Sequence, residues 1–315
     1  MTDIFVREDV RAFLDMVEAA ARPPMSEQTP AEAREGMRVS VLIAEAPPRE
    51  LALIRDLSCP GPAGDIPLRL YDSRAERGPS HVVMFYHGGG FTIGSVDTHH
   101  AFCTEVAAAL DLPVVSVEYR LAPEAPFPAA PDDCEAATRW VAGSPDALGR
   151  EVTGVVTMGD SAGGNLAIVI ANALVDAPAD VPVVLQAPIY PIADDIAQHD
   201  SYKVFGDGYL LTRDSMRFFD DCYAPAEGDI RNHPILREAV PGTPPAVICT
   251  AGLDPLRDSG RNYAAHLIRA GIDTTYLEFP GVIHGFVTLR KLIASGQRNV
   301  ETFLAACRSM LEART

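Results

Sequence analysis

The sequence lacks the features that define several classes of protein. None of its 315 residues belongs to a run approaching the ~20 apolar residues that a membrane-spanning helix needs. No apolar run follows a basic segment at the N-terminus, so the sequence predicts no signal peptide. Positive charge is in deficit, because 26 Lys and Arg face 43 Asp and Glu, a net charge of −17. This charge argues against nucleic acid or an anionic membrane surface as a partner.

Cysteine and metal-ligand patterns are also sparse. The six cysteines include no C-x-x-C pair. Four of them fall in helix-like or strand-like runs: Cys103, Cys134, Cys222 and Cys249. We therefore expect buried free thiols and a cytoplasmic location. His99-His100 is an isolated pair, and adjacent residues of a helix do not share a face, so we expect no metal and no cofactor.

Apolar runs and helical patterns alternate along most of the chain. This alternation predicts an α/β fold, with a mostly parallel central sheet flanked by helices on both faces. We expect strands at 81–86, 113–118, 154–158, 183–186, 246–250 and 274–279. We expect helices near 98–110, 132–141, 162–175, 258–270 and 297–312. Before them, 51–57 and 66–71 predict an antiparallel pair joined by a Pro/Gly turn at 59–64.

Two segments stand outside this alternation. At the N-terminus, 8–21 has the spacing of an amphipathic helix that ends at Arg22-Pro23-Pro24. Thr29 and Pro30 then predict the N-cap and first residue of a second helix. Farther along, 192–236 interrupts the alternation and contains another helix-like run at 212–219.

Gly159-Asp160-Ser161-Ala162-Gly163 fits the G-x-S-x-G pattern and lies between a predicted strand and a predicted helix. The glycines allow a tight strand-to-helix turn that exposes the serine hydroxyl near a helix N-terminus. This setting predicts a nucleophilic Ser161. An ordinary glycine-rich turn is the less favoured interpretation.

His87-Gly88-Gly89-Gly90 follows another predicted buried strand. Its glycines leave backbone N–H groups unshielded, which is typical of a loop that stabilises an oxyanion, together with the N–H of Ala162 after the serine. A flexible loop without a role is the alternative. We expect His87 to hold this loop in place and not to act as a base.

A nucleophilic serine needs a base and an orienting carboxylate, in the chain order Ser, Asp or Glu, His. Four histidines follow Ser161: His199, His233, His266 and His284. His284 is the preferred base because it lies in a loop directly after a predicted strand. Asp254 is the preferred acid because it follows the end of the 246–250 strand. Asp258 is the rival, with helix capping or support of His284 as its other roles.

These motifs, with Glu118–Glu124 (EYRLAPE), Asp254–Asp258 (DPLRD) and His284-Gly285-Phe286, resemble the hormone-sensitive-lipase family and its bacterial carboxylesterase branch. The resemblance runs from about Leu51 to the C-terminus. It implies an α/β-hydrolase core with a helical cap, a Ser161–Asp254–His284 triad, and oxyanion donors on Gly89, Gly90 and Ala162. On this basis we expect cap helices at 1–48, the core at 49–191 and 237–315, and a cap insertion at 192–236.

A cap would wall off a substrate pocket. The candidate substrate-binding residues are Phe91, Ile93, Tyr190, Phe205, Tyr209 and Leu211. For Tyr190 and the residues of the insertion, ordinary core packing is an equally good interpretation.

Together these features predict a serine carboxylesterase acting on short- to medium-chain esters through an acyl-enzyme. An amidase or carbohydrate deacetylase could use the same triad, and a long-chain lipase would need a wide apolar cap. A non-catalytic small-molecule-binding protein on the same fold ranks low because His284 is present. The resemblance also allows a homodimer through the edge strand at 274–279.

Overall fold

A central sheet organises the molecule. In this computed structural model, which describes residues 4–21, 23–226 and 228–314, its strands are β1 (Leu53–Gly61), β2 (Gly64–Asp72), β3 (Ser80–Tyr86), β4 (Val114–Val117), β5 (Val152–Asp160), β6 (Val183–Ile189), β7 (Ala246–Leu253) and β8 (Thr274–Ile283). Their order across the sheet is β1-β2-β4-β3-β5-β6-β7-β8. Only the pairings of β2 are antiparallel, so the predicted mostly parallel α/β sheet is confirmed.

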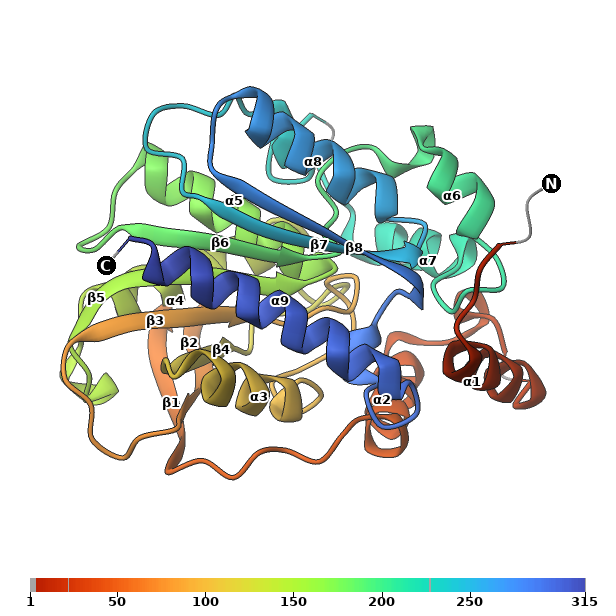
Figure 1. Ribbon diagram of the computed structural model, residues 1–315, viewed down its shortest axis with the longest axis horizontal. Coiled ribbons are helices and arrows are strands. Elements are labelled where there is room, and N and C mark those ends of the chain that lie inside the picture. The colour runs from red at the N-terminus through yellow and green to blue at the C-terminus, as the bar shows by residue number, and fades with distance from the viewer. Residues whose placement is uncertain (1–3, 22, 227, 315) are drawn as a thin grey trace.

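Helices cover both faces of the sheet (Figure 1). The helices of one face are α3 (His100–Leu110) and α9 (Ala294–Glu312), and those of the other are α4 (Ala129–Ala142), α5 (Ala162–Asp176) and α8 (Arg257–Arg269). The inner strands are runs of β-branched and other apolar residues, which suits strands buried on both faces. From Val82 to Tyr86, for example, every side chain of β3 is fully buried.

The β1–β2 hairpin differs from the expectation. Its turn is limited to Pro62 and Ala63, whereas the sequence predicted a turn over 59–64. Cys59 instead pairs with Ile66 in the ladder, and β2 begins at Gly64, where φ is +131°. Because glycine tolerates this conformation, the chain reverses within two residues and both strands are longer than predicted.

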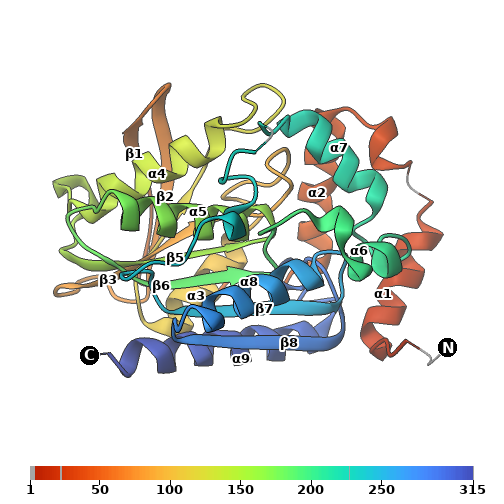
Figure 2. The ribbon, with the colours of Figure 1, turned by 90° about the horizontal axis from the view of Figure 1, so that it is seen from above.

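Four helices lie together beyond the carboxyl ends of the parallel strands (Figure 2). They are α1 (Glu8–Ala19), α2 (Pro30–Ala44), α6 (Asp200–Phe205) and α7 (Arg213–Tyr223). The predicted start of α2 is confirmed, because Thr29 and Glu32 form a capping box in front of Pro30. Arg22, part of the predicted stop after α1, lies outside the described residues.

The N-terminal helices and the 192–236 insertion are connected to each other and to the core. The N–H of Ser26 donates to Asp214 Oδ2 at 3.0 Å, joining the segment before α2 to α7. The insertion is held at both ends by Asn165 of α5, whose Nδ2 donates to the carbonyls of Ile192 at 3.0 Å and Asn232 at 3.3 Å. Two segments far apart in sequence therefore cover the same edge of the sheet.

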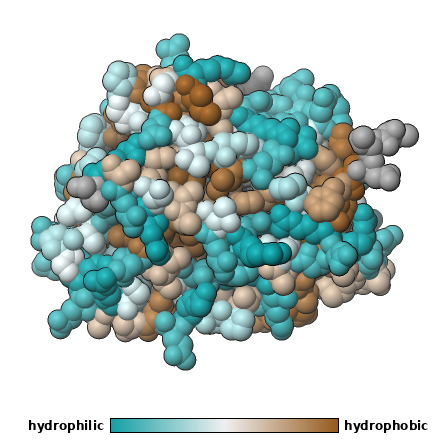
Figure 3. Space-filling model, in the orientation of Figure 1, coloured by the Kyte–Doolittle hydropathy of each residue, from teal (hydrophilic) through white to brown (hydrophobic). Residues whose placement is uncertain are grey.

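The face in Figure 3 is mainly hydrophilic, with apolar atoms in small scattered groups. Among the described helices, none is both long enough and apolar enough to cross a membrane. All six cysteines are free, and only Cys222 is less than fully buried.

The turn between β5 and α5 requires a close approach to β3. A Cβ on Gly163 would lie 1.9 Å from the carbonyl oxygen of Tyr86, and one on Gly159 would lie 2.3 Å from the carbonyl oxygen of Gly163. Both distances are far below van der Waals contact, so a side chain at either position would force the backbone apart.

We therefore expect Gly163→Ala to lower the free energy of unfolding by about 1–3 kcal/mol through overpacking. Gly36→Ala is the matched control, because Gly36 also lies in a helix but an added Cβ would meet no atom within 4 Å. It should raise that free energy by about 0.5–1 kcal/mol, since alanine favours helix more than glycine. Urea denaturation of both variants measures the difference, and shifts of the same sign would contradict the prediction.

Candidate active site

Ser161 occupies the turn between β5 and α5 in an unusual backbone conformation. Its φ is 57° and its ψ is −118°, a region that non-glycine residues rarely adopt. The Ser161 N–H donates to the carbonyl of Ile189 at 2.9 Å, and its own carbonyl accepts from the Asn165 N–H at 3.0 Å. Such conformations persist where the surroundings enforce them, and they cluster at functional sites.

The side chains of Ser161, His284 and Asp254 form a continuous hydrogen-bonded line. His284 Nε2 lies 2.9 Å from Ser161 Oγ, and His284 Nδ1 lies 2.7 Å from Asp254 Oδ2. Asp254 is fully buried, and its other carboxylate oxygen accepts from the Leu256 N–H at 2.8 Å. Asp254 and His284 directly follow the neighbouring strands β7 and β8, which explains why residues 30 positions apart meet.

Asp258, the rival carboxylate, has other partners. It lies in the first turn of α8, accepts from the Ser201 N–H at 2.9 Å, and is paired with Arg257 and Arg261. Asp258 thus joins α8 to α6, and the structure records no contact between it and His284.

The glycine loop after β3 lies beside the Ser161 turn. Gly89 and Gly90 have φ values of +121° and +57°. A Cβ on Gly90 would lie 2.2 Å from the Phe219 ring of α7, so this position leaves no room for a side chain. Within the described part of the chain, the N–H groups of Gly89 and Gly90 have no hydrogen-bond acceptor, whereas the Gly89 carbonyl accepts from Thr92 and Ile93. Ala162, the first residue of α5, is also buried here.

A buried ion pair connects this loop to the serine turn. Asp160 Oδ1 accepts from the Gly88 N–H at 2.8 Å and lies 3.1 Å from His99 Nε2. Burial by itself lowers the pKa of His99, but the Asp160 carboxylate outweighs it and the pKa lies above its ordinary value. Burial likewise raises the pKa of Asp160, but His99 and the Gly88 N–H hold that pKa below its ordinary value. Both shifts favour the charged forms of the pair, and Asp160 positions Gly88 through its N–H.

His87 has the structural role that the sequence predicted. Its ring stacks on Tyr119 with centroids 4.2 Å apart, and its Nδ1 lies 2.9 Å from the Gly88 carbonyl. Burial, followed by the repulsion of His99, lowers the pKa of His87 to about 3. A neutral, fully buried ring of this kind supports the loop, and the structure records no hydrogen bond between it and Ser161.

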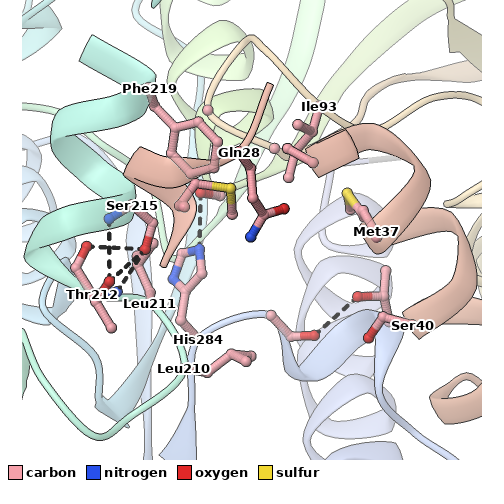
Figure 4. A pocket seen from close by; sticks show the side chains of 18 of the residues that line it. Gln28, Met37, Ser40, Ile93, Leu210, Leu211, Thr212, Ser215, Phe219 and His284 are labelled. Carbon is pink, nitrogen blue, oxygen red and sulfur yellow. Dashed lines mark hydrogen bonds between the residues drawn. The ribbon is translucent and has the colours of Figure 1, made fainter. Parts of the chain in front are cut away.

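A cavity of about 1250 Å³ opens above Ser161 and His284 between α2 and α7 (Figure 4). Of the candidate wall residues, Phe91, Ile93 and Leu211 line it. The other three are placed differently. Tyr190 packs beneath His284, with ring centroids 4.5 Å apart, and its hydroxyl donates to Asp160 at 3.4 Å.

Phe205 and Tyr209 contact each other edge to face, and Arg257 lies 5.0 Å over the Phe205 ring. These contacts correspond to the packing alternative. Tyr190, Phe205 and Tyr209 therefore fit the packing interpretation, because each contacts a neighbouring ring and Tyr190 also contacts the Asp160 carboxylate.

Several residues at the site are not predicted by any motif in the sequence. Arg34 of α2 donates to the carbonyls of Thr92 and Ala122, both at 2.8 Å, and so holds α2 beside the glycine loop. The sequence indicates His99 only as half of the adjacent pair His99-His100. Only its position before an apolar helix could have indicated burial, and nothing local could have indicated Asp160 as its partner. Among the described residues, no three His, Cys, Asp or Glu side chains are placed to hold a metal ion.

The fold and the arrangement around Ser161 define an α/β hydrolase. The family model described as alpha/beta hydrolase fold matches residues 83–288, and the chain belongs to that family. The resemblance to the hormone-sensitive-lipase and carboxylesterase group is thereby confirmed.

Curated relatives and solved structures are similar over most of the chain. An ethyl acetate hydrolase of Pseudomonas putida is 34% identical over 315 residues, covering 96% of this chain and 98% of the relative. The carboxylic ester hydrolase LipN of Mycobacterium tuberculosis is 40% identical over 271 residues, covering 82% of this chain and 70% of the relative. The crystal structure of an alpha/beta hydrolase enzyme from the metagenome of Lake Arreo, Spain, has a TM-score of 0.90 at 36% identity, covering 97% and 98% of the two chains.

The His99–Asp160 pair gives a testable pH dependence. Because the folded-state pKa of His99 is raised, its charged form stabilises the fold below the unfolded pKa of 6.5, and this contribution is lost as pH rises through the folded-state pKa. His99→Gln leaves Asp160 without its partner and should lower the free energy of unfolding by about 3–5 kcal/mol at about pH 6.

Denaturant unfolding of both proteins from about pH 6 to about pH 9 checks this, since the titration window is set by the His99 pKa. The difference between wild type and variant should shrink as pH rises. A difference that stays constant over this range would contradict the loss of a His99 proton in this pH window.

Proposed function

We propose that the protein is a serine carboxylesterase that hydrolyses short- to medium-chain carboxylic esters through an acyl-enzyme intermediate. The observation that carries this proposal is the line of hydrogen bonds from Asp254 through His284 to the Ser161 hydroxyl at the floor of a mainly apolar cavity. The curated relatives that are named as ester hydrolases support it.

In the proposed reaction, Asp254 accepts the Nδ1–H of His284 and fixes the imidazole tautomer. Nε2 then takes the proton of Ser161 while Oγ attacks the ester carbonyl. His284 returns that proton to the leaving alcohol, and an acyl-Ser161 remains. Water, activated by the same nitrogen, attacks the acyl group and releases the carboxylic acid, which restores the Ser161 hydroxyl.

The negative charge that develops on the carbonyl oxygen needs fixed donors. We assign this role to the N–H groups of Gly89, Gly90 and Ala162. The uncommitted N–H groups of the two glycines and the start of α5 at Ala162 support this assignment. Preorganised donors of this kind contribute roughly 3–4 kcal/mol each to transition-state stabilisation.

We also propose that residues 1–48 and 192–236 together form a cap on a core made of 49–191 and 237–315. The contact between Ser26 and Asp214 supports the union of the two cap segments. A cap that excludes water strengthens electrostatic interactions at the reacting carbonyl. Its mainly apolar lining favours simple esters over carbohydrates, whose hydroxyl groups would lack partners in an apolar wall.

A small-molecule ester is the proposed partner. A homodimer through β8, which lies at the edge of the sheet, stays a prediction, as does a cytoplasmic location.

Ser161→Ala should lower kcat on p-nitrophenyl acetate by about 10⁴-fold or more and abolish the burst of nitrophenol, because no acyl-enzyme can form. Ser309→Ala, on the exposed surface of α9, is the control and should leave kcat unchanged. Stopped-flow absorbance measures both phases. Near-normal turnover in Ser161→Ala would refute the assigned nucleophile.

Asp254→Asn should lower kcat by about 10⁴-fold, because an amide favours the wrong histidine tautomer. Asp258→Asn is the matched control: it removes the same charge four positions away, from a carboxylate that binds Ser201 and two arginines. Asp258→Asn should lower the free energy of unfolding and leave kcat within about threefold of wild type. A threefold change corresponds to less than ~1 kcal/mol in activation free energy. A larger loss of kcat in Asp258→Asn than in Asp254→Asn would exchange the two assignments.

A further inference from the structure

One wall of the cavity is formed by α2. Among the α2 residues that line it, Ala33, Gly36, Met37, Ser40 and Ala44 have a spacing of three or four residues, which places these five on the same side of the helix. Met37 and Ser40 point from α2 toward the space above His284 (Figure 4). Gly36 lies between Ala33 and Ser40 on this face, within the interior of the helix.

Packing does not explain why residue 36 is a glycine. At the helical glycines Gly164, Gly260 and Gly296, an added Cβ would meet a neighbour at 3.0, 2.4 and 3.2 Å. At Gly36 it would meet nothing within 4 Å, and φ is not positive there. Glycine is unfavourable in a helix interior, so an unforced glycine on a cavity wall points to space that the cavity's occupant uses.

The position of α2 is fixed, so the helix cannot move away to accommodate a larger side chain. Arg34 binds the carbonyls of Thr92 and Ala122 on one flank. At the other end of the helix, Glu45 pairs with the buried Arg290, and the Ala44 carbonyl accepts two backbone N–H groups. A side chain at residue 36 would therefore reduce the free volume of the cavity.

The neighbouring wall indicates what that space receives. Four methionines line the same cavity: Met16, Met25, Met37 and Met216. Methionine side chains are apolar and adapt their shape, which suits hydrocarbon groups of variable length.

We propose that Gly36 is a specificity-determining residue, and that the space beside its Cα receives the extended apolar arm of the ester, either the acyl chain or the alcohol group. This inference rests on the proposed esterase function. A larger residue at this position would exclude long arms and leave the reaction of short esters intact, because a short arm does not reach this space.

The test compares wild type with Gly36→Leu on two ester series. One lengthens the acyl chain, from p-nitrophenyl acetate to p-nitrophenyl decanoate, and the other lengthens the alcohol, from ethyl acetate to octyl acetate. For the longest members of at least one series, kcat/KM should fall by about tenfold or more, which is what excluding a few methylenes costs. For the shortest members it should stay within about twofold of wild type. The series that responds identifies the arm.

Two further variants keep the result interpretable. Gly36→Ala adds one methyl group, should fold at least as well as wild type, and should show a smaller loss in the same direction. Gly78→Leu makes the matched change in an exposed loop before β3, where an added Cβ would also meet nothing within 4 Å, and should change neither series.

A fall of equal size at every length in both series, or no change in either, would overturn the inference while wild-type hydrolysis upholds the esterase function. A wild-type protein inactive on both series would overturn the proposed function and the inference with it.

Discussion

The site depends on how closely α5 and β5 approach the end of β3. Gly159 and Gly163 permit that approach, since a Cβ on either would overlap a backbone carbonyl oxygen. The approach holds Ser161 in a conformation that serine rarely adopts and places its hydroxyl beside the glycine loop. Without it, the histidine and aspartate at the ends of β8 and β7 would face no hydroxyl. The strain at the turn is offset by the packing of the buried inner strands β3, β4 and β5.

The glycine loop is the point at which the core and the covering helices meet. Asp160 holds it from below through Gly88, Arg34 of α2 holds it from the side through Thr92, and Phe219 of α7 packs on Gly90. The proposed oxyanion donors are therefore positioned by the serine turn and by both proposed cap segments. The wall of the cavity and the reacting groups are connected through Arg34 and Phe219, so substitution of either of these side chains should alter the loop as well as substrate fit.

Much of this arrangement is predictable from the sequence, for a physical reason. Parallel strands end at one edge of a sheet, so Ser161, Asp254 and His284, each placed after a recognisable strand, must lie near one another. The N-terminal helices could be located from their periodicity and caps, but an amphipathic pattern does not say what its apolar face contacts. For that reason the sequence does not predict the α2 wall with Gly36. It also leaves cavity wall and core packing equally open for Tyr190, an aromatic residue at a strand end that packs beneath His284. The His99–Asp160 pair joins residues 61 positions apart, so no local sequence pattern predicts it.

The most direct test of the central claim, that this arrangement transfers an acyl group through Ser161, is to locate the covalent intermediate. Asp254→Asn protein, in which deacylation should be slow, would be mixed with p-nitrophenyl acetate, quenched in acid, digested and analysed by mass spectrometry. The account predicts one acetyl group on the peptide containing Ser161 and none in the same variant carrying Ser161→Ala. Acetyl groups on another side chain, or ester hydrolysis by the wild type that persists when Ser161 is removed, would contradict it.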